Sequence, residues 1–160
     1  MKTKKQILAW LSAVCMLAAL LCGCGGTQKA AAQTCTLTIE CVSVLDHSED
    51  VAENKRELVP ADGFILPETE CAFSEDESAY DLLQRVCQEQ GIHLESSWSE
   101  MFNSAYIEGI GNLYEGDVGA ESGWGYTVNG EFPPVGCSEY VLQDGDALVF
   151  SYYCSYAEMM

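Results

Sequence analysis

Two segments of the chain alternate apolar and polar residues in the way that half-buried β-strands do. The first runs from residue 35 to 44 and the second from 147 to 154. Their apolar members are Cys35, Leu37, Ile39 and Cys41 in the first segment and Leu148, Phe150, Tyr152 and Cys154 in the second. Because side chains alternate between the two faces of a strand, each set shares one face. We therefore predict two strands that each bury one face.

A spacing of three and four residues marks one helix between Ser78 and Gly91. The apolar residues at this spacing are Ala79, Leu82, Leu83, Val86 and Cys87. Ser78 is suited to the N-cap, and Asp81, three positions later, makes a variant of the capping box. Gly91 is suited to end the helix in the left-handed conformation. The pattern predicts a helix over 79–90 with its apolar face turned inward.

Turn-forming residues divide the rest of the chain into short extended pieces. Turn signals stand at Asp62-Gly63, Asn129-Gly130 and Asp144-Gly145-Asp146, and Pro67 is predicted to break a strand. Short strands are predicted at 64–66, 69–73, 92–98, 105–110 and 123–128, and a polar loop or short frayed turn at 46–56. One helix packed on a sheet of several short strands is an α+β domain.

The N-terminus has the pattern of a secretory signal. Three lysines lie among the first five residues, and residues 7–21 form an apolar run shorter than the roughly 20 residues of a membrane-spanning helix. The sequence Leu21-Cys22-Gly23-Cys24 then resembles the lipobox of bacterial lipoproteins, whose cysteine is acylated. We predict a signal peptide over 1–23, lipidation at Cys24, a tether over 24–34 and a domain on the extracellular face of the membrane. An ordinary signal peptide or an uncleaved anchor is the alternative.

The chain is strongly acidic, with 25 acidic and 7 basic side chains and a net charge of −18. Without residues 1–23 it would keep all 25 acidic but only 4 basic side chains, a net charge of −21. Proteins bind nucleic acid through Lys and Arg, so this charge excludes nucleic acid as a partner. We interpret the acidic residues as a solubilising surface, with a calcium-binding cluster as the alternative. No twelve-residue loop of the EF-hand kind is present.

Six cysteines remain once the three N-terminal ones are assigned to the signal and the anchor. They are Cys35, Cys41, Cys71, Cys87, Cys137 and Cys154. An even number in a small exported domain favours disulfides, and we predict two or three. Cys35 and Cys41 are not expected to pair, because they lie about 20 Å apart along one extended strand. Cys87 is the best candidate for a buried free thiol, and the spacings match no zinc motif, so no metal site is predicted.

No arrangement of residues points to catalysis. His47 and His93 are the only histidines, and neither has a second histidine at a metal-binding spacing. The chain has no Gly-x-Ser-x-Gly elbow, and Gly109-x-Gly111 lacks the third glycine of a phosphate loop. Pairs of carboxylates are too common in so acidic a chain to mark a site. We therefore expect a protein that is not an enzyme and requires no cofactor.

Aromatic residues gather in the sequence around the Asn129-Gly130 turn. They are Tyr114, Trp124, Tyr126, Phe132 and Tyr140. One interpretation is that they fill a small core; the other is that some form an apolar shelf for a ligand, since binding sites are mostly apolar. Pro133-Pro134 stiffens the segment after the turn. On the second interpretation the ligand contacts are Trp124, Tyr126, Phe132 and Pro133.

Four segments in order resemble the transcobalamin-like C-terminal domain, which also occurs in exported and surface-anchored proteins of Gram-positive bacteria. They are Ser78-Ala79-Tyr80-Asp81-Leu82-Leu83, Tyr106-Ile107-Glu108-Gly109-Ile110, Gly123-Trp124-Gly125-Tyr126-Thr127-Val128-Asn129-Gly130 and Tyr140-Val141-Leu142-Gln143-Asp144-Gly145-Asp146. The resemblance covers about residues 35–156. It implies a β-grasp-like single domain, with one helix across a mixed sheet.

In the vitamin B12 carriers this domain resembles a lid over the corrin. The resemblance assigns the corresponding contacts to Trp124 through Pro133, with Tyr126 at the aromatic strand position and Phe132 or Pro133 at the apolar tip. The carriers hold the vitamin between this domain and a large helical barrel, which the 160 residues do not include. The resemblance therefore implies that this domain alone offers a ligand one face.

Two functions of different classes fit these observations. The first is a lipid-anchored surface protein that binds a small ligand, with cobalamin or another corrinoid as the candidate, and passes it to a transporter. The second is a protein-interaction or wall-associated module with no small-molecule ligand. An exposed shelf of Tyr126 and Phe132 would favour the first function, and burial of both residues in the core would favour the second.

Overall fold

A computed structural model describes residues 33–159, which lie within one compact unit. The predicted signal peptide, the predicted lipidation site Cys24 and all of the predicted tether before Gln33 lie outside the described residues. The elements in chain order are β1 (Gln33–Glu40), η1 (Val42–His47), η2 (Glu53–Leu58), β2 (Phe64–Phe73), α2 (Ala79–Gln90), β3 (Leu94–Ser99), β4 (Ser104–Ile110), β5 (Leu113–Tyr114), β6 (Gly123–Val128), β7 (Ala147–Tyr153) and η3 (Tyr156–Met159). Of the helices among these residues, none is long and apolar enough to cross a membrane.

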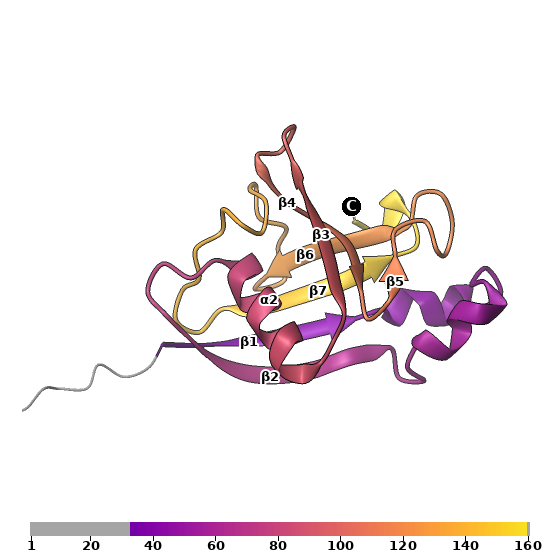
Figure 1. Cartoon of the computed structure of the whole chain (residues 1–160), viewed down its shortest axis with the longest axis horizontal. Helices are drawn as coiled ribbons and strands as arrows, with labels where there is room; N and C mark the ends of the chain where they lie inside the picture. Colours follow the sequence, from indigo (N-terminus) through magenta and orange to yellow (C-terminus); the bar gives the residue numbers. More distant parts are fainter. Residues whose placement is uncertain (1–32, 160) are drawn as a thin grey trace, which may run out of the picture. The chain divides into compact units, whose positions relative to one another are not determined.

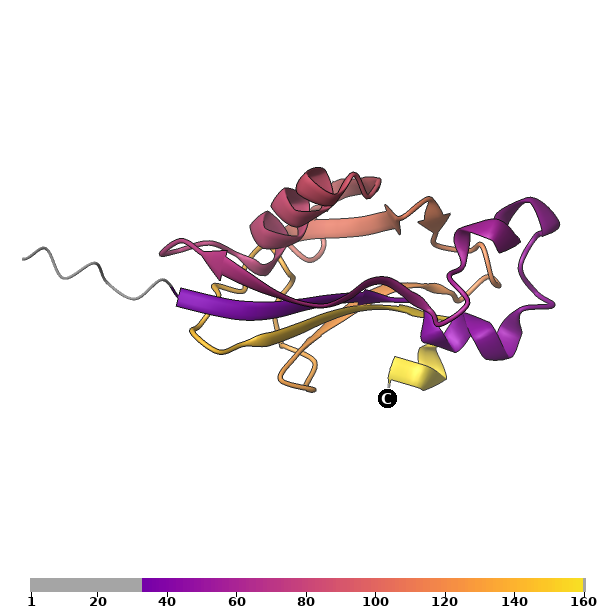
Figure 2. The same cartoon turned by 90° about the horizontal axis from the view of Figure 1, so that it is seen from below.

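Four strands form a mixed sheet in the order β2-β1-β7-β6 (Figure 1). The first and last strands of the domain, β1 and β7, run parallel at its centre, and the two outer pairs are antiparallel. β3, β4 and β5 form a second, antiparallel sheet. Figure 2 shows α2 and this second sheet on the same side of the four-stranded sheet. The predicted α+β class, with one helix packed on a mixed sheet of short strands, is confirmed.

The helix α2 has the predicted bounds and the predicted caps. The Ser78 hydroxyl accepts a hydrogen bond from the backbone N–H of Asp81 at 3.1 Å, and the Asp81 carboxylate accepts one from the N–H of Ser78 at 3.1 Å. Gly91 follows in the left-handed conformation with φ 68°. All five residues of the predicted apolar face are buried. Local signals alone therefore located this element.

The core lies between α2 and the inner face of the four-stranded sheet. Its fully buried members include Leu37 and Ile39 of β1, Leu82 and Leu83 of α2, and Leu148, Phe150 and Tyr152 of β7. The two alternating patterns thus mark the two central strands. The prediction for β1 was wrong at its C-terminal end, because the strand stops at Glu40 and the chain turns into η1.

The sequence predicted that Pro67 breaks the second strand, and this prediction was wrong. β2 is continuous from Phe64 to Phe73, and its pairing with β1 shifts register between Leu37 and Ile39. Proline has no N–H to donate, so strands tolerate it at such irregularities and on sheet edges, and β2 is an edge strand. The two predicted pieces are therefore one bulged strand.

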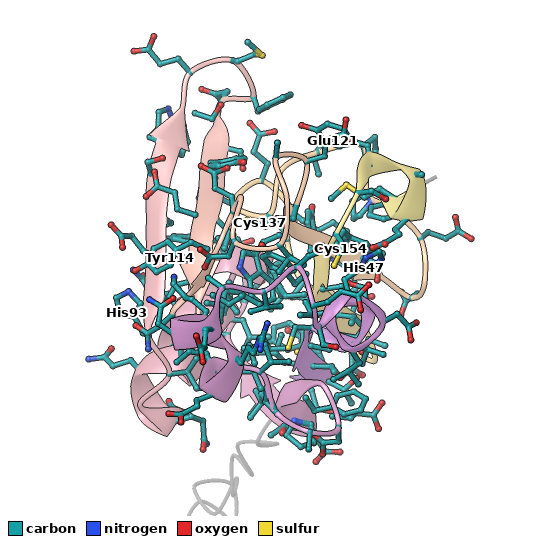
Figure 3. The ribbon with its side chains drawn as sticks, turned by 90° about the vertical axis from the view of Figure 1, so that its right-hand side faces the viewer. His47, His93, Tyr114, Glu121, Cys137 and Cys154 are labelled. Carbon is teal, nitrogen blue, oxygen red and sulfur yellow. The ribbon has the colours of Figure 1, made fainter. Side chains whose placement is uncertain are left out.

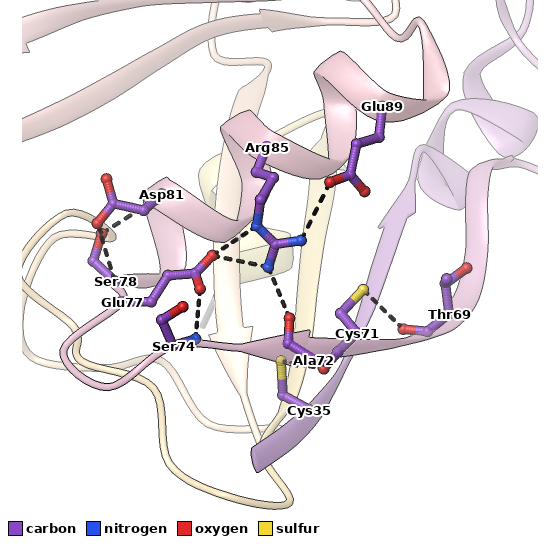
Figure 4. A network of polar contacts seen from close by, with 10 residues as sticks. All are labelled: Cys35, Thr69, Cys71, Ala72, Ser74, Glu77, Ser78, Asp81, Arg85 and Glu89. Carbon is purple, nitrogen blue, oxygen red and sulfur yellow. Dashed lines mark hydrogen bonds and ion pairs between the residues drawn. The ribbon is translucent and has the colours of Figure 1, made fainter. Parts of the chain in front are cut away.

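Arg85 ties α2 to the end of β2 (Figure 4). Its guanidinium donates two hydrogen bonds to one carboxylate oxygen of Glu77, at 2.9 and 3.1 Å, and one to the carbonyl oxygen of Ala72 at 2.8 Å. The other oxygen of Glu77 accepts from the N–H of Ser74 at 2.8 Å. One of the few basic side chains is thus engaged within the fold.

Asp146 organises the turn that leads into β7. Its buried carboxylate accepts hydrogen bonds from the N–H of Gln143 at 2.9 Å, the hydroxyl of Tyr140 at 3.0 Å and the side-chain amide of Asn129 at 2.9 Å. The amide oxygen of Asn129 in turn accepts from the N–H of Ala147 at 2.9 Å. This network joins the two turns that the sequence signals at 129–130 and 144–146.

Candidate functional site

An apolar cleft of about 150 Å³ opens between β4 and β6. Its aromatic lining consists of Phe102, Tyr106, Trp124, Tyr126 and Phe150. Phe102 comes from the turn between β3 and β4, Tyr106 from β4, Trp124 and Tyr126 from β6, and Phe150 from β7. Segments far apart in the sequence therefore converge on one opening.

The side chains of Trp124 and Tyr126 are fixed before any ligand arrives. The indole N–H of Trp124 donates to the carbonyl oxygen of Leu113 at 2.9 Å, and the ring meets Tyr152 edge-on with centroids 5.3 Å apart. Tyr126 stacks on Phe150 at 5.6 Å, and its hydroxyl donates to the carbonyl oxygen of Val135 at 2.7 Å. Burial raises the pKa of the Tyr126 phenol, so this hydroxyl stays neutral. A preformed lining reduces the ordering cost of binding.

The structure does not bring the four predicted ligand contacts together. Trp124 and Tyr126 lie on the inner face of the four-stranded sheet, with Phe150. Phe132 is exposed and lies 6.0 Å from the ring of Tyr153, whose side chain points to the outer face because it alternates with its buried neighbour. Pro133 follows Phe132 and is half-buried. No single shelf of Tyr126 and Phe132 therefore exists.

The other two aromatic residues of the predicted cluster have separate roles. Tyr114 lies in β5, and the ammonium of Lys55 lies 4.8 Å from the centroid of its ring. The hydroxyl of Tyr114 lies 2.8 Å from Nε2 of His93. Tyr140 is held by Asp146, as described above. The predicted cluster is therefore divided among β5, the cleft, the outer face of the four-stranded sheet and the turn before β7. Figure 3 shows Tyr114 and His93 near each other.

The end of β3 and the turn that follows it carry exposed apolar side chains that sequence reasoning missed. Trp98 is 60% exposed, Met101 85% and Phe102 65%. Met101 and Phe102 lie in the turn and follow no helical or strand period, so the only available signal was the presence of two apolar residues in a loop. Phe102 lies at the mouth of the cleft, while Trp98 and Met101 extend the apolar surface beyond it.

One wall of the cleft depends on a glycine. Ser138 joins the segment after the 129–130 turn to β4, because its hydroxyl lies 2.9 Å from that of Ser104 and accepts from the N–H of Ala105 at 3.0 Å. Because the two segments lie so close together, a Cβ on Gly136 would lie 2.2 Å from the Cβ of Ser104. No other residue fits at Gly136 without a shift of this wall.

The prediction of two or three disulfides differs from the structure. All six cysteines among the described residues are free thiols, and all are buried. Cys35 and Cys71 are direct partners on β1 and β2, yet each Sγ faces a backbone carbonyl oxygen, at 3.8 and 3.5 Å. An even number of cysteines is thus no proof of pairing, and the core takes these side chains as small apolar groups. Cys87, the predicted buried free thiol, is in the core.

These thiols are expected to resist alkylation in the native protein. Burial is the largest cause that raises the pKa of Cys35, Cys41, Cys87 and Cys137 from 9.0 to about 11. Because the thiolate is the reactive form, iodoacetamide at pH 8 should leave these four positions unmodified and label them after denaturation. Peptide mapping by mass spectrometry measures both. Modification of Cys87 at the same rate in both states would contradict the burial.

The same shift gives a dependence of stability on pH. Above pH 9 the unfolded chain releases thiol protons that the folded chain retains, so the free energy of unfolding should fall between pH 9 and about 11. Denaturant titrations at pH 8, 9.5 and 10.5 test this. The decrease should be smaller in a Cys87→Ala variant, which serves as the control.

Part of the chain matches a family model. Residues 76–153 match a family described as "Domain of unknown function (DUF4430)". The matched part runs from just before α2 to the end of β7 and includes the residues that line the cleft. No curated protein matches the chain.

Two solved structures are similar to this chain. The first is haptocorrin in complex with Cbi, with 12% sequence identity and a TM-score of 0.51 over 84% of this chain and 28% of the haptocorrin chain. At this identity the likeness shows the fold alone, and the match spans less than a third of haptocorrin. The second is described as "a putative metal binding protein from Ruminococcus gnavus", with 16% identity, a TM-score of 0.44, and coverage of 76% of this chain and 96% of that one.

Proposed function

We propose that this chain is a non-catalytic binding protein whose cleft between β4 and β6 takes one edge of a flat, largely apolar ligand. The aromatic lining of the cleft is the observation that carries the proposal, because apolar walls with few polar groups are typical of ligand sites. Corrinoids such as cobalamin are the proposed ligand class. The fold shared with haptocorrin, a structure solved with Cbi, and the transcobalamin-like motifs support that choice.

The size of the cleft indicates how such a ligand is held. Its volume of about 150 Å³ is smaller than the ~300–1,000 Å³ of pockets that enclose a drug-sized molecule. The cleft therefore covers an edge and leaves most of the ligand open to water or to a partner. We propose weak binding by the domain alone and tighter binding when a transporter or another surface protein covers the second side.

The proposed location follows from the N-terminal sequence. The Leu21-Cys22-Gly23-Cys24 sequence and the preceding apolar run support a lipid anchor at Cys24, with the domain outside the cell. The surplus of acidic side chains suits a soluble surface held at the membrane by acyl chains. In this arrangement the cleft faces ligands outside the cell.

Phe102 and Phe132 form a matched pair that tests the site. Both are exposed phenylalanines, but Phe102 lines the cleft and Phe132 lies on the other face of the sheet. In isothermal titration of the detergent-solubilised chain with cobalamin and cobinamide, Phe102→Ala should weaken binding about tenfold, or about 1.4 kcal/mol. Phe132→Ala should leave the affinity unchanged, and neither variant should change the melting temperature much.

Two results would contradict this proposal. Loss of binding in Phe132→Ala with normal binding in Phe102→Ala would move the site to the outer face. Absence of corrinoid binding by the unaltered chain at high micromolar concentration would favour the second candidate function, a protein-interaction module. The exposed side chains of Trp98 and Met101 favour that candidate specifically, because they extend an apolar surface beyond the cleft.

A further inference from the structure

Three side chains with different donor atoms meet at the end of the sheet where the parallel strands β1 and β7 both end. His47 comes from the end of η1, Cys154 from the residue after β7, and Glu158 from η3. The nitrogen, sulfur and oxygen atoms that they offer all lie within 4.8 Å of one another. Figure 3 shows His47 and Cys154 side by side. No sequence motif indicates this group of residues, because His47 and Cys154 lie far apart in the chain.

The carboxylate of Glu158 is already held in place between the other two residues. One of its oxygens accepts a hydrogen bond from the backbone N–H of Cys154 at 2.8 Å. The other lies 3.6 Å from Nε2 of His47. In a tetrahedral zinc site with bonds of roughly 2.0–2.3 Å, neighbouring ligand atoms are about 3.3–3.8 Å apart. The observed separation therefore matches one edge of such a tetrahedron.

The imidazole of His47 has a carboxylate on its other side. Its Nδ1 atom lies 3.6 Å from an oxygen of Asp50, while Nε2 faces Glu158. Histidines that bind metals usually direct the second ring nitrogen to a carboxylate or a carbonyl, which fixes the ring and its tautomer. Asp50 lies on the side of the ring from which such a carboxylate would act.

The surroundings favour a cation. A cavity of about 290 Å³ beside His47 and Glu158 is also bounded by Glu40 and Asp46, and none of its lining residues is a lysine or arginine. The Cys154 side chain is buried, and its sulfur lies 3.5 Å from the hydroxyl oxygen of Ser43. The set thus combines a thiol, an imidazole and a carboxylate at an acidic opening to solvent.

We propose that His47, Cys154 and Glu158 bind one Zn²⁺ ion, with a water molecule at the fourth position. Nitrogen and sulfur donors select zinc over calcium and magnesium, which prefer oxygen donors. Binding displaces the thiol proton of Cys154 to solvent, and no redox step is involved. No metal site was predicted from the sequence, because the three ligands have no zinc-motif spacing along the chain. The zinc site lies apart from the cleft, and its role does not depend on the corrinoid proposal.

Cobalt is the probe for a direct test. The full chain carries Cys15→Ser, Cys22→Ser and Cys24→Ser, so that the N-terminal thiols contribute nothing. It is stripped with a chelator in detergent and titrated with Co²⁺. We expect a thiolate-to-cobalt absorption band and tetrahedral visible bands that saturate at one equivalent and disappear when Zn²⁺ is added. Cys154→Ser should abolish the thiolate band. His47→Ala should abolish the saturation at one equivalent. Asp50→Asn should lower the affinity about 10- to 100-fold.

Matched variants separate this site from general binding to an acidic protein. Cys137→Ser removes another buried thiol, and His93→Ala removes the other histidine, which lies beside Tyr114 and Glu95; both should bind as the unaltered chain does. Glu158→Gln changes a surface residue and should weaken binding even if Cys154→Ser fails to fold. Absence of the thiolate band in the unaltered chain would overturn the proposal. So would full binding by both His47→Ala and Glu158→Gln.

Discussion

Leu83→Ala is expected to lower the free energy of unfolding by about 2–5 kcal/mol. Leu83 is fully buried on the face of α2 that covers the four-stranded sheet, so the substitution leaves a cavity among well-packed neighbours. The free energy of unfolding of a single domain is only about 5–15 kcal/mol, so the change is a large part of it. Urea titration followed by tryptophan fluorescence, to which the buried Trp124 contributes, measures the difference.

Gln84→Ala is the control on the same turn of the helix. Gln84 is exposed, so its replacement by alanine should change the free energy by no more than about 0.5 kcal/mol. If Leu83→Ala lowered the free energy of unfolding no more than Gln84→Ala does, the described packing of α2 on the sheet would be contradicted.

Asp146→Asn is expected to cost about 2–4 kcal/mol, because the new amide nitrogen faces groups that donate hydrogen bonds. The Asp146 carboxylate accepts from Gln143, Tyr140 and Asn129, and both of its oxygens are engaged. An amide group supplies one oxygen in place of two, so at least one of these donors loses its acceptor on the buried Asp146 side chain. Denaturant titration of the two proteins gives the difference.

Asp144→Asn is the matched control, two residues earlier in the same turn. Asp144 is exposed, and a single oxygen accepts from the N–H of Thr34 at 2.9 Å, an interaction that an asparagine retains. A loss well under 1 kcal/mol is expected there. Equal losses in the two variants would show that the charge of the turn, and not the buried network, stabilises it.

The sequence predicted those elements whose signals are local. The bounds of α2 follow from its period and from Ser78 and Gly91. The position of β7 follows from its alternation and the turn before it, and β6 ends at the predicted Asn129-Gly130 turn. The alternation of β1 misled beyond Glu40, because Cys41 is buried after the end of the strand just as it would be within a strand. Pro67 misled because the effect of a proline depends on whether its strand is at an edge, which is a property of the whole sheet.

The candidate sites were less predictable, because they depend on which face a residue finally occupies. Trp124 and Tyr126 share a strand, so their common face was predictable, and it lines the cleft. Phe132 follows a tight turn, and no local rule says on which side of the sheet the chain returns. Phe102 enters the cleft from a turn, and the three proposed zinc ligands meet only when η1, β7 and η3 come together.

The parallel pairing of β1 with β7 fixes the order in which the domain can form. The centre of the sheet joins the first and last strands, so that Ser151 donates to Glu40 across 111 residues of sequence. Until residues 147–153 are available, β1 can pair only with β2, and the core lacks Leu148, Phe150 and Tyr152. Contacts so distant in sequence make folding slow, since a long loop must close first. A chain that is synthesised from its N-terminus would thus stay without its full core until nearly all of it is available.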